Sequence, residues 1–372
     1  MAERVSDKSL DRVGPVLALG PENYTDPDIF RRERERVFFR TWQYAGHISQ
    51  LEKPGSYFTF TILDQNLFCV RGRDNEIRCF YNVCQHRAHQ LVQGEGRKHM
   101  LTCPYHAWAY DLTGALRTAP NGDVVPGFDK DKICLTSVKL EDFNGFLFVN
   151  LDPDAEPMSA WYGAAADEIR DYVPQIDRLK PVFWTEVDEA CNWKISVENY
   201  SECYHCSLNH PTFSNGVIDP TKYNIVPENH VLRHYTVAAS QDGMTYQIDL
   251  ESNPHAGDYG SWFLWPMFSF QVYPGNVLNT YLWRATGVEG VKVFRGWYTV
   301  DGVESDAVIQ LAGQDRSTTV AEDIGLVESV QRGLHSRGYR PGPLVLDPNQ
   351  GVNSEHSIKA LYDWYQTAMA GG

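Results

Sequence analysis

The chain has 372 residues, of which 42% are apolar, so it can form a large hydrophobic core and more than one globular domain. Its formal charge of −15 argues against nucleic-acid binding, because a phosphate-binding face needs clustered lysine and arginine. No apolar run is long enough to cross a bilayer, and the first residues lack the apolar core of a signal peptide. We therefore expect a cytoplasmic protein with no membrane or nucleic-acid partner.

The first predicted element is a helix, for which Asp26 is the N-cap and Pro27 the first residue. Its apolar positions are Phe30, Val37 and Phe38. The basic stretch 31–40 alternates with glutamates such as Glu33, which is typical of a solvated helix face. We expect residues 1–41 to be a helical segment that packs on the second of two domains.

Residues 42–155 have the pattern of a small all-β domain. Short runs rich in β-branched and aromatic residues alternate with Gly, Asp and Asn turns, at 57–63, 67–72, 76–83 and 145–151. Residues 152–163 contain prolines and small residues and are predicted to form a linker. Eight cysteines in a large cytosolic chain favour reduced thiols or metal ligands over disulfides.

The second domain, residues 156–372, is mixed, so the predicted fold class is α+β. The segments that we expect to be antiparallel strands are 231–240, 267–274, 278–285 and 291–300. The expected helices are 318–339 and 354–369.

Two Cys-His pairs form the first candidate metal site. Cys84 and His86 are followed, after sixteen residues, by Cys103 and His106. Two thiolates and two imidazoles are the ligands of a Rieske [2Fe-2S] cluster, in which histidines raise the reduction potential. The same four residues could bind structural zinc, but zinc modules usually group Cys with Cys and His with His. The pattern therefore favours the cluster.

A second candidate site lies near His205 and His210. Glu202 and His205 would share a helix face at i and i+3, whereas His210 would lie elsewhere if the helix continued. Pro211 disfavours helical geometry at His210, so we expect the helix to end near Asn209 and the second imidazole to turn back.

A 2-His-1-carboxylate iron site needs a third ligand and leaves positions open for dioxygen. Asp323 lies on the apolar stripe of a predicted helix, where a carboxylate is costly unless a metal or hydrogen bonds compensate it. The apolar positions of this stripe are Val320, Val327, Val330 and Leu334. Glu322 should point off the stripe, so Asp323 is the better candidate.

Residues 82–116 resemble the Rieske domain of ring-hydroxylating and N-demethylating oxygenase α subunits. The resemblance extends over nearly the whole chain and implies a Rieske domain followed by a helix-grip catalytic domain. It also implies that His205, His210 and Asp323 bind mononuclear Fe(II), and that Asn199 supports the iron histidines. In such enzymes an acidic residue at the position of Glu202 relays electrons between subunits, which implies a homotrimer.

The segments 198–206, 322–340 and 354–358 are similar to those of the quaternary-ammonium group, the carnitine monooxygenases and stachydrine demethylases. That resemblance implies O2-dependent hydroxylation of a carbon next to nitrogen, followed by N-dealkylation or C–N cleavage. An aromatic ring hydroxylase or O-demethylase is the alternative, and an electron carrier is a remote one. The chain has no flavin or nicotinamide fingerprint, so a separate NAD(P)H-dependent flavin/iron-sulfur reductase must supply electrons.

A quaternary ammonium group has no proton to donate, so its small-molecule substrate would be recognised by aromatic faces. The predicted substrate-binding residues are Tyr200, Phe270, Tyr281 and Trp283.

Overall fold

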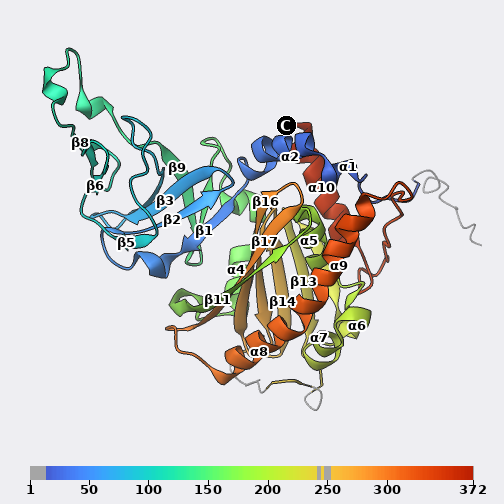
Figure 1. The fold of residues 1–372 in the computed structure, drawn as a ribbon. Coiled ribbons are helices and arrows are strands. Elements are labelled where there is room, and N and C mark those ends of the chain that lie inside the picture. The colour runs from blue at the N-terminus through green and yellow to red at the C-terminus, as the bar shows by residue number, and fades with distance from the viewer. Residues whose placement is uncertain (1–13, 241–243, 247–252, 372) are drawn as a thin grey trace, which may run out of the picture.

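The computed structural model describes residues 14–240, 244–246 and 253–371. Two antiparallel sheets organise it: one belongs to an N-terminal β domain and the other to a larger C-terminal domain whose helices cover one sheet face (Figure 1). The expected combination of an all-β domain and an α+β domain is confirmed.

The N-terminal sheet has seven strands in the order β1-β10-β9-β4-β3-β2-β5, and a small sheet β6-β7-β8 lies beyond it. The strands are β1 (Gln43–His47), β2 (Ser56–Ile62), β3 (Gln65–Arg71), β4 (Ile77–Tyr81), β5 (Glu95–Arg97), β6 (Leu101–Thr102), β7 (Ala109–Tyr110), β8 (Leu116–Thr118), β9 (Ser137–Phe143) and β10 (Phe146–Asn150). Short one-turn helices are η2 (Ile48–Leu51), η3 (Gly122–Val124) and η4 (Lys130–Lys132). Each of the four predicted strand runs is a strand.

The C-terminal sheet also has seven strands, in the order β11-β17-β16-β15-β14-β13-β12. They are β11 (Leu179–Glu189), β12 (Asn224–Glu228), β13 (Val231–Val237), β14 (Asp258–Leu264), β15 (Phe268–Tyr273), β16 (Val277–Gly287) and β17 (Gly290–Val300). All four predicted strands are present. Strands β11, β12 and β14 were not predicted, because charged, proline or glycine residues interrupt their alternation.

The other regular elements of the described chain are helices. They are α1 (Glu22–Thr25), α2 (Pro27–Glu33), the π-helix η1 (Arg34–Phe38), α3 (Met158–Tyr162), α4 (Ala165–Tyr172), η5 (Ile176–Arg178), α5 (Trp193–Tyr200), α6 (Cys206–Asn209), α7 (Pro211–Gly216), η6 (Pro220–Lys222), α8 (Asp306–Ser317), α9 (Thr319–Leu334) and α10 (His356–Ala370). Figure 1 shows α9 crossing the face of the sheet. Part of the predicted linker is the helix α3, because Met158 and Tyr162 are buried in the core.

The two faces of the C-terminal sheet have different partners, as the alternation of β15 shows. Phe270 is fully buried on the face toward the N-terminal domain, with its ring centroid 5.6 Å from that of Phe143 and 4.8 Å from that of Phe146. Gln271 and Tyr273 point to the opposite face, which the helices cover. The prediction that Phe270 binds substrate is therefore wrong: its side chain belongs to the interdomain core.

The N-terminal helix begins as predicted, because Asp26 Oδ1 accepts a hydrogen bond from the backbone N–H of Asp28. Its charged face is not fully solvated, however. Glu33 is completely buried, and its carboxylate accepts hydrogen bonds from Lys194 Nζ at 2.5 Å, Trp193 Nε1 at 2.8 Å and Tyr365 Oη at 2.8 Å. The helix therefore attaches to α5 and α10 through a buried ion pair, which the alternation of charge could not indicate.

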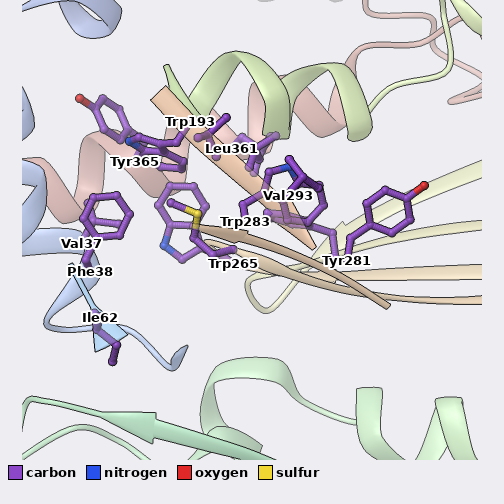
Figure 2. Packing of buried hydrophobic residues seen from close by; sticks show 14 of the residues in the cluster. Val37, Phe38, Ile62, Trp193, Trp265, Tyr281, Trp283, Val293, Leu361 and Tyr365 are labelled. Atoms are coloured by element: carbon purple, nitrogen blue, oxygen red, sulfur yellow. The ribbon is translucent and has the colours of Figure 1, made fainter. Parts of the chain in front are cut away.

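An apolar cluster surrounds this attachment. Figure 2 shows it extending from Ile62 and Phe38, through Trp193 and Trp265, to Trp283, and these residues belong to a single contact cluster. The cluster thus connects a strand of the β domain, the N-terminal helix and the C-terminal sheet. Because cores are close-packed, this cluster fixes the position of α5, which leads directly to residues 201–210.

Glu198, one turn after Lys194 on α5, is a second buried carboxyl in this region. Its Oε1 accepts a hydrogen bond from Tyr24 Oη at 2.8 Å. Burial raises the pKa of Glu198 from 4.5 to about 7, against the opposing effects of the Tyr24 hydrogen bond and of Lys194. The folded protein therefore retains this proton at pH values where the unfolded chain has lost it.

We predict that this retained proton makes the protein less stable as pH rises from 5 to 8. The folded state must then ionise a buried carboxyl, which costs up to about 2 kcal/mol over that interval. Glu198→Gln should reduce the fall in Tm between pH 5 and 8, measured by differential scanning fluorimetry. The exposed carboxyl of Glu304 provides the control, since Glu304→Gln should keep the wild-type slope. Parallel slopes for all three proteins would contradict the assignment.

Candidate functional site

The two Cys-His loops adopt the same backbone turn. Ala88 N–H donates to the carbonyl of Cys84 and Ala107 N–H to that of Cys103, both at 3.0 Å. Ala88 and Ala107 have φ of +58° and +59°, an unusual conformation for a residue with a side chain. The spacings of one and two residues between Cys and His therefore occur in two equivalent turns.

These turns separate the thiols from the imidazoles. Cys84 and Cys103 are each 2% exposed and neither forms a disulfide, whereas His86 is exposed and His106 half-buried. The two imidazole centroids lie 4.5 Å apart. Two free buried thiols beneath two paired imidazoles match the donor set of a Rieske cluster, with its histidine-bound iron toward the surface. His89, outside the pattern, is exposed.

Tyr110 supports the inner side of this site. Its hydroxyl lies 3.4 Å from Cys84 Sγ and accepts a hydrogen bond from the backbone N–H of Gln85 at 3.0 Å. An O–H group directed at a thiolate stabilises the more negative, reduced cluster.

Removing that hydroxyl should lower the reduction potential of the cluster. For Tyr110→Phe we expect a decrease on the order of 40 mV, since a hydrogen bond contributes about 1 kcal/mol and a tenfold change in a one-electron equilibrium is about 59 mV. Redox titration followed by circular dichroism measures it. Tyr105→Phe, at the exposed tyrosine of the second loop, is the matched control. An unchanged potential in Tyr110→Phe would rule out a tuning role.

The second site brings together three side chains. His210 Nε2 lies 3.0 Å from His205 Nε2 and 3.0 Å from Asp323 Oδ1, and His205 Nε2 is 3.6 Å from that carboxylate oxygen. One potential ligand atom from each of the three side chains lies within 4.8 Å of the other two, which is close enough for all three to bind one metal ion. Two imidazoles and one carboxylate fit the 2-His-1-carboxylate set for Fe(II).

The local chain explains how the histidines meet. α6 ends at Asn209 as predicted, and Pro211 begins α7, so the chain changes direction at His210. Glu202 and His205 do not share a helix, because α5 ends at Tyr200 and both residues lie in the connection to α6, of which His205 is the N-cap. That expectation is wrong, although the connection still brings the two side chains together.

The Nδ1 atom of each histidine contacts a glutamate carboxylate. Glu202 Oε1 lies 2.5 Å from His205 Nδ1, and Glu322 Oε2 lies 2.7 Å from His210 Nδ1. Such pairs fix the tautomer and direct both Nε2 atoms toward the metal position. Burial alone would lower the pKa of His205, but hydrogen bonds to Asp323 and Glu202 outweigh it and raise the pKa to about 9.

Glu322 contacts His210, so the prediction that its side chain points away from the buried face of the helix is wrong. Glu322 lies in the first turn of α9, where the chain around His210 packs against the helix. The buried stripe is also rotated from the predicted one: Val330 is 50% exposed, whereas Gln331 is 3% exposed and accepts a hydrogen bond from the backbone of Asn192. A long side chain can reach a neighbour that the helical wheel does not assign to it.

We predict different losses for the two acidic residues. Asp323→Asn should abolish mononuclear iron binding and turnover, because it removes a charged candidate ligand. Glu322→Ala should weaken iron affinity about 10- to 100-fold by releasing His210, the usual effect of losing such a partner. Iron content after gel filtration measures both, and unchanged Rieske absorption is the internal control. Full iron affinity in Glu322→Ala would show that the contact has no orienting role.

A cavity opens beside these three residues. Its described lining residues are Glu189, Ser196, Asn199, Tyr200, Glu202, Cys203, His205, His210, Phe213, Tyr223, His234, Tyr259, Ser261, Gln271, Tyr273, Tyr281, Trp283, Val293, Arg295, Thr319 and Asp323. Of the four predicted substrate-binding residues, Tyr200, Tyr281 and Trp283 line the cavity and Phe270 does not. Asn199 and Glu202 line it as well. The ring of Tyr200 is 4.8 Å from that of Tyr281 and 4.9 Å from that of Trp283, measured between centroids.

The predicted substrate-binding set lacks several residues that line the cavity, notably Phe213, Tyr259, Gln271, Tyr273 and Arg295. Alternation along β15 was the available signal for Gln271 and Tyr273, because they share a face that excludes Phe270. Arg295 pairs with Tyr281 across β16 and β17, a register that depends on the whole sheet.

Cys203 and Cys206, on either side of His205, form a disulfide, contrary to the expectation of reduced or metal-bound cysteines. The bridge closes a tight loop around the histidine. The other six cysteines are free.

Comparison with known proteins identifies the family. The model of the ring hydroxylating alpha subunit catalytic domain matches residues 176–371, and that of the Rieske [2Fe-2S] domain matches residues 41–129. The chain belongs to the Rieske-type ring-hydroxylating oxygenase α subunits. It is therefore the oxygenase component of a non-haem iron enzyme, and its cofactors are a Rieske cluster and a mononuclear iron. No described helix has the length and apolar character needed to cross a membrane.

Relatives of this oxygenase act on quaternary ammonium compounds. It is 36% identical over 344 residues to the carnitine monooxygenase oxygenase subunit of Escherichia coli K12, covering 91% of this chain and 90% of that protein. It is 28% identical to the chloroplastic choline monooxygenase of Beta vulgaris, over 92% and 77% of the two chains. The structure of the quaternary ammonium Rieske monooxygenase CntA with L-carnitine aligns with a TM-score of 0.84 at 31% identity, covering 95% of this chain and 96% of that one.

Proposed function

We propose that this oxygenase hydroxylates a carbon next to the nitrogen of a betaine- or carnitine-like quaternary or methylated amine. The observation that carries the proposal is the aromatic cavity beside His205, His210 and Asp323. Its tyrosine, phenylalanine and tryptophan rings can hold a cation that has no proton to donate. Relatives that act on carnitine and choline support this substrate class.

The overall chemistry balances with O2 and two electrons that the reductase delivers through the Rieske cluster. The substrate carbon, O2, two electrons and two protons give a hydroxylated carbon and water. The hydroxyl next to a quaternary nitrogen then loses its proton as the C–N bond breaks, which releases a tertiary amine and an aldehyde. The bound iron would supply dioxygen activation, which the protein side chains cannot provide.

Within that reaction the chain supplies orientation. His205, His210 and Asp323 would hold the iron, and Glu202 and Glu322 keep the two imidazoles in the required tautomer through their Nδ1 contacts. Asn199 lines the same cavity and is proposed to support the iron histidines. The surrounding rings exclude water and position the substrate.

The two candidate metal sites also suggest an assembly. In one chain, the loops next to β6 that bear the cluster ligands lie at the opposite end of the molecule from α6 and α7 (Figure 1). We propose a homotrimer in which Glu202 connects the cluster of one subunit to the iron of its neighbour. A separate NAD(P)H-dependent reductase with flavin and iron-sulfur groups would supply the electrons, consistent with a cytoplasmic enzyme.

The alternatives make different demands on the cavity. An electron carrier has no use for the second metal site or its cavity. An aromatic ring hydroxylase or O-demethylase would use the same irons, and naphthalene 1,2-dioxygenase shares the fold at 19% identity. Such an enzyme would bind neutral rings, with no preference for a permanent cation.

We predict that a quaternary betaine supports substrate-dependent oxygen uptake and amine release with a surrogate reductase. In calorimetry on anaerobic enzyme, the betaine should bind more tightly than its neutral tert-butyl isostere. Trp283→Leu should reduce that preference about 2- to 30-fold, because a leucine retains apolar contact but not the ring face.

Phe270→Leu is the matched control for this experiment. It too removes a ring from the C-terminal sheet, but from β15 and on the interdomain face, so the preference for the cation should remain. Tighter binding of a neutral arene than of either compound would instead favour the ring-hydroxylase alternative.

A further inference from the structure

Strand β17 places a buried arginine in the wall of the cavity. The side chain of Arg295 is 7% exposed, and its Nη1 donates to Asp315 Oδ2 at 3.1 Å. Its Cζ lies 4.6 Å from the centroid of the Tyr281 ring. Among the described residues that line the cavity, Arg295 is the only lysine or arginine.

The hydrogen-bonding capacity of this guanidinium is only partly used. An arginine side chain has five N–H donors, and burying such a cation is costly unless those donors are satisfied. Arg295 Nε is buried and has no hydrogen-bond partner. Asp315 offsets part of the charge, but it is not among the described lining residues, so the arginine is the charged member of this pair that faces the cavity.

The sheet register places Arg295 in the same layer as the substrate-facing rings. Arg295 pairs with Tyr281, and Tyr281 pairs in turn with Ser269, whose hydroxyl contacts that of Tyr200 at 2.6 Å. The negative charge of Asp323 also acts on Arg295, which places the guanidinium within electrostatic reach of the iron site. Arg295 occupies one face of Tyr281, so a substrate cation would contact the opposite face or other rings.

We propose that Arg295 binds a carboxylate of the substrate, so that the enzyme selects zwitterionic ammonium carboxylates over ammonium alcohols and amines. The inference rests on the proposed function and deepens it by naming the second recognised group. A guanidinium matches a carboxylate geometrically and can donate two parallel hydrogen bonds to it. A bound carboxylate would use donors that the protein leaves free.

A carboxylate-binding role for Arg295 would also distinguish the two substrates for which the relatives are named. Carnitine carries a carboxylate in addition to its trimethylammonium group, whereas choline carries a hydroxyl group. Fixing the carboxylate at Arg295 orients the molecule, because its opposite end is then free to reach His205, His210 and Asp323. Arg295 is thus a specificity-determining residue.

Calorimetry on anaerobic holoenzyme with γ-butyrobetaine and its methyl ester tests the proposal. The two ligands share the ammonium group and chain, and differ in the carboxylate charge. The wild-type enzyme should bind the acid about 10- to 100-fold more tightly than the ester, the range for hydrogen bonds to charged groups. Arg295→Gln should remove that difference while changing the ester Kd less than about threefold, since the ester lacks the charge-assisted hydrogen bonds.

A second variant addresses a purely structural role of Arg295. Asp315→Asn removes the competing carboxylate and should preserve or increase the preference for the acid, whereas a structural ion pair would weaken both ligands alike. If Arg295→Gln does not fold, Arg295→Lys replaces it, with the preference reduced but retained. Equal binding of acid and ester by the wild-type enzyme would overturn the carboxylate assignment alone. If neither ligand binds, the proposed function fails together with it.

Discussion

Concentrated negative charge around two histidines is the constraint on which the active region depends. Asp323, Glu202 and Glu322 all contact His205 or His210 and lie in a partly buried environment. Carboxylates in such positions are unfavourable unless hydrogen bonds, protons or a cation compensate them. Burial alone would lower the pKa of His205, but the hydrogen bonds and charges of Asp323 and Glu202 raise it. A divalent cation bound between the histidines and Asp323 would supply the positive charge that these carboxylates require.

One face of the C-terminal sheet packs against the Rieske domain, and the opposite face lines the cavity beside the histidines. Phe268 and Phe270 pack against aromatic residues of the Rieske domain, and this contact holds the two domains together. Residues one position away, such as Gln271, face the cavity. A shift of one residue in register would exchange these sets, so the domain interface and the substrate pocket depend on the same pairing of strands. Stability and specificity are therefore coupled in β15.

The sequence predicted features that short segments determine. The Cys-His spacings, the change of direction at Pro211 and the helical position of Asp323 each depend on a few neighbouring residues, and the structure has the corresponding turns and helices. The errors concern contacts between distant segments. Glu33 looked solvated because its partners, Lys194 and Tyr365, come from the second domain. Similarly, the contact of Glu322 with His210 and the pairing of Arg295 with Tyr281 depend on packing and register that no local pattern encodes.

The buried attachment of Glu33 has a consequence for synthesis on the ribosome. One carboxylate binds residues from the middle of the chain, on α5, and from its last helix, α10. The Rieske domain has its own sheet and can form as soon as its strands have emerged. In contrast, the hydrogen-bond network that joins α5 to Glu33 lacks one member until Tyr365 has left the exit tunnel. The helix that leads into the proposed iron-binding segment therefore gains its last contact with Glu33 only at the end of synthesis.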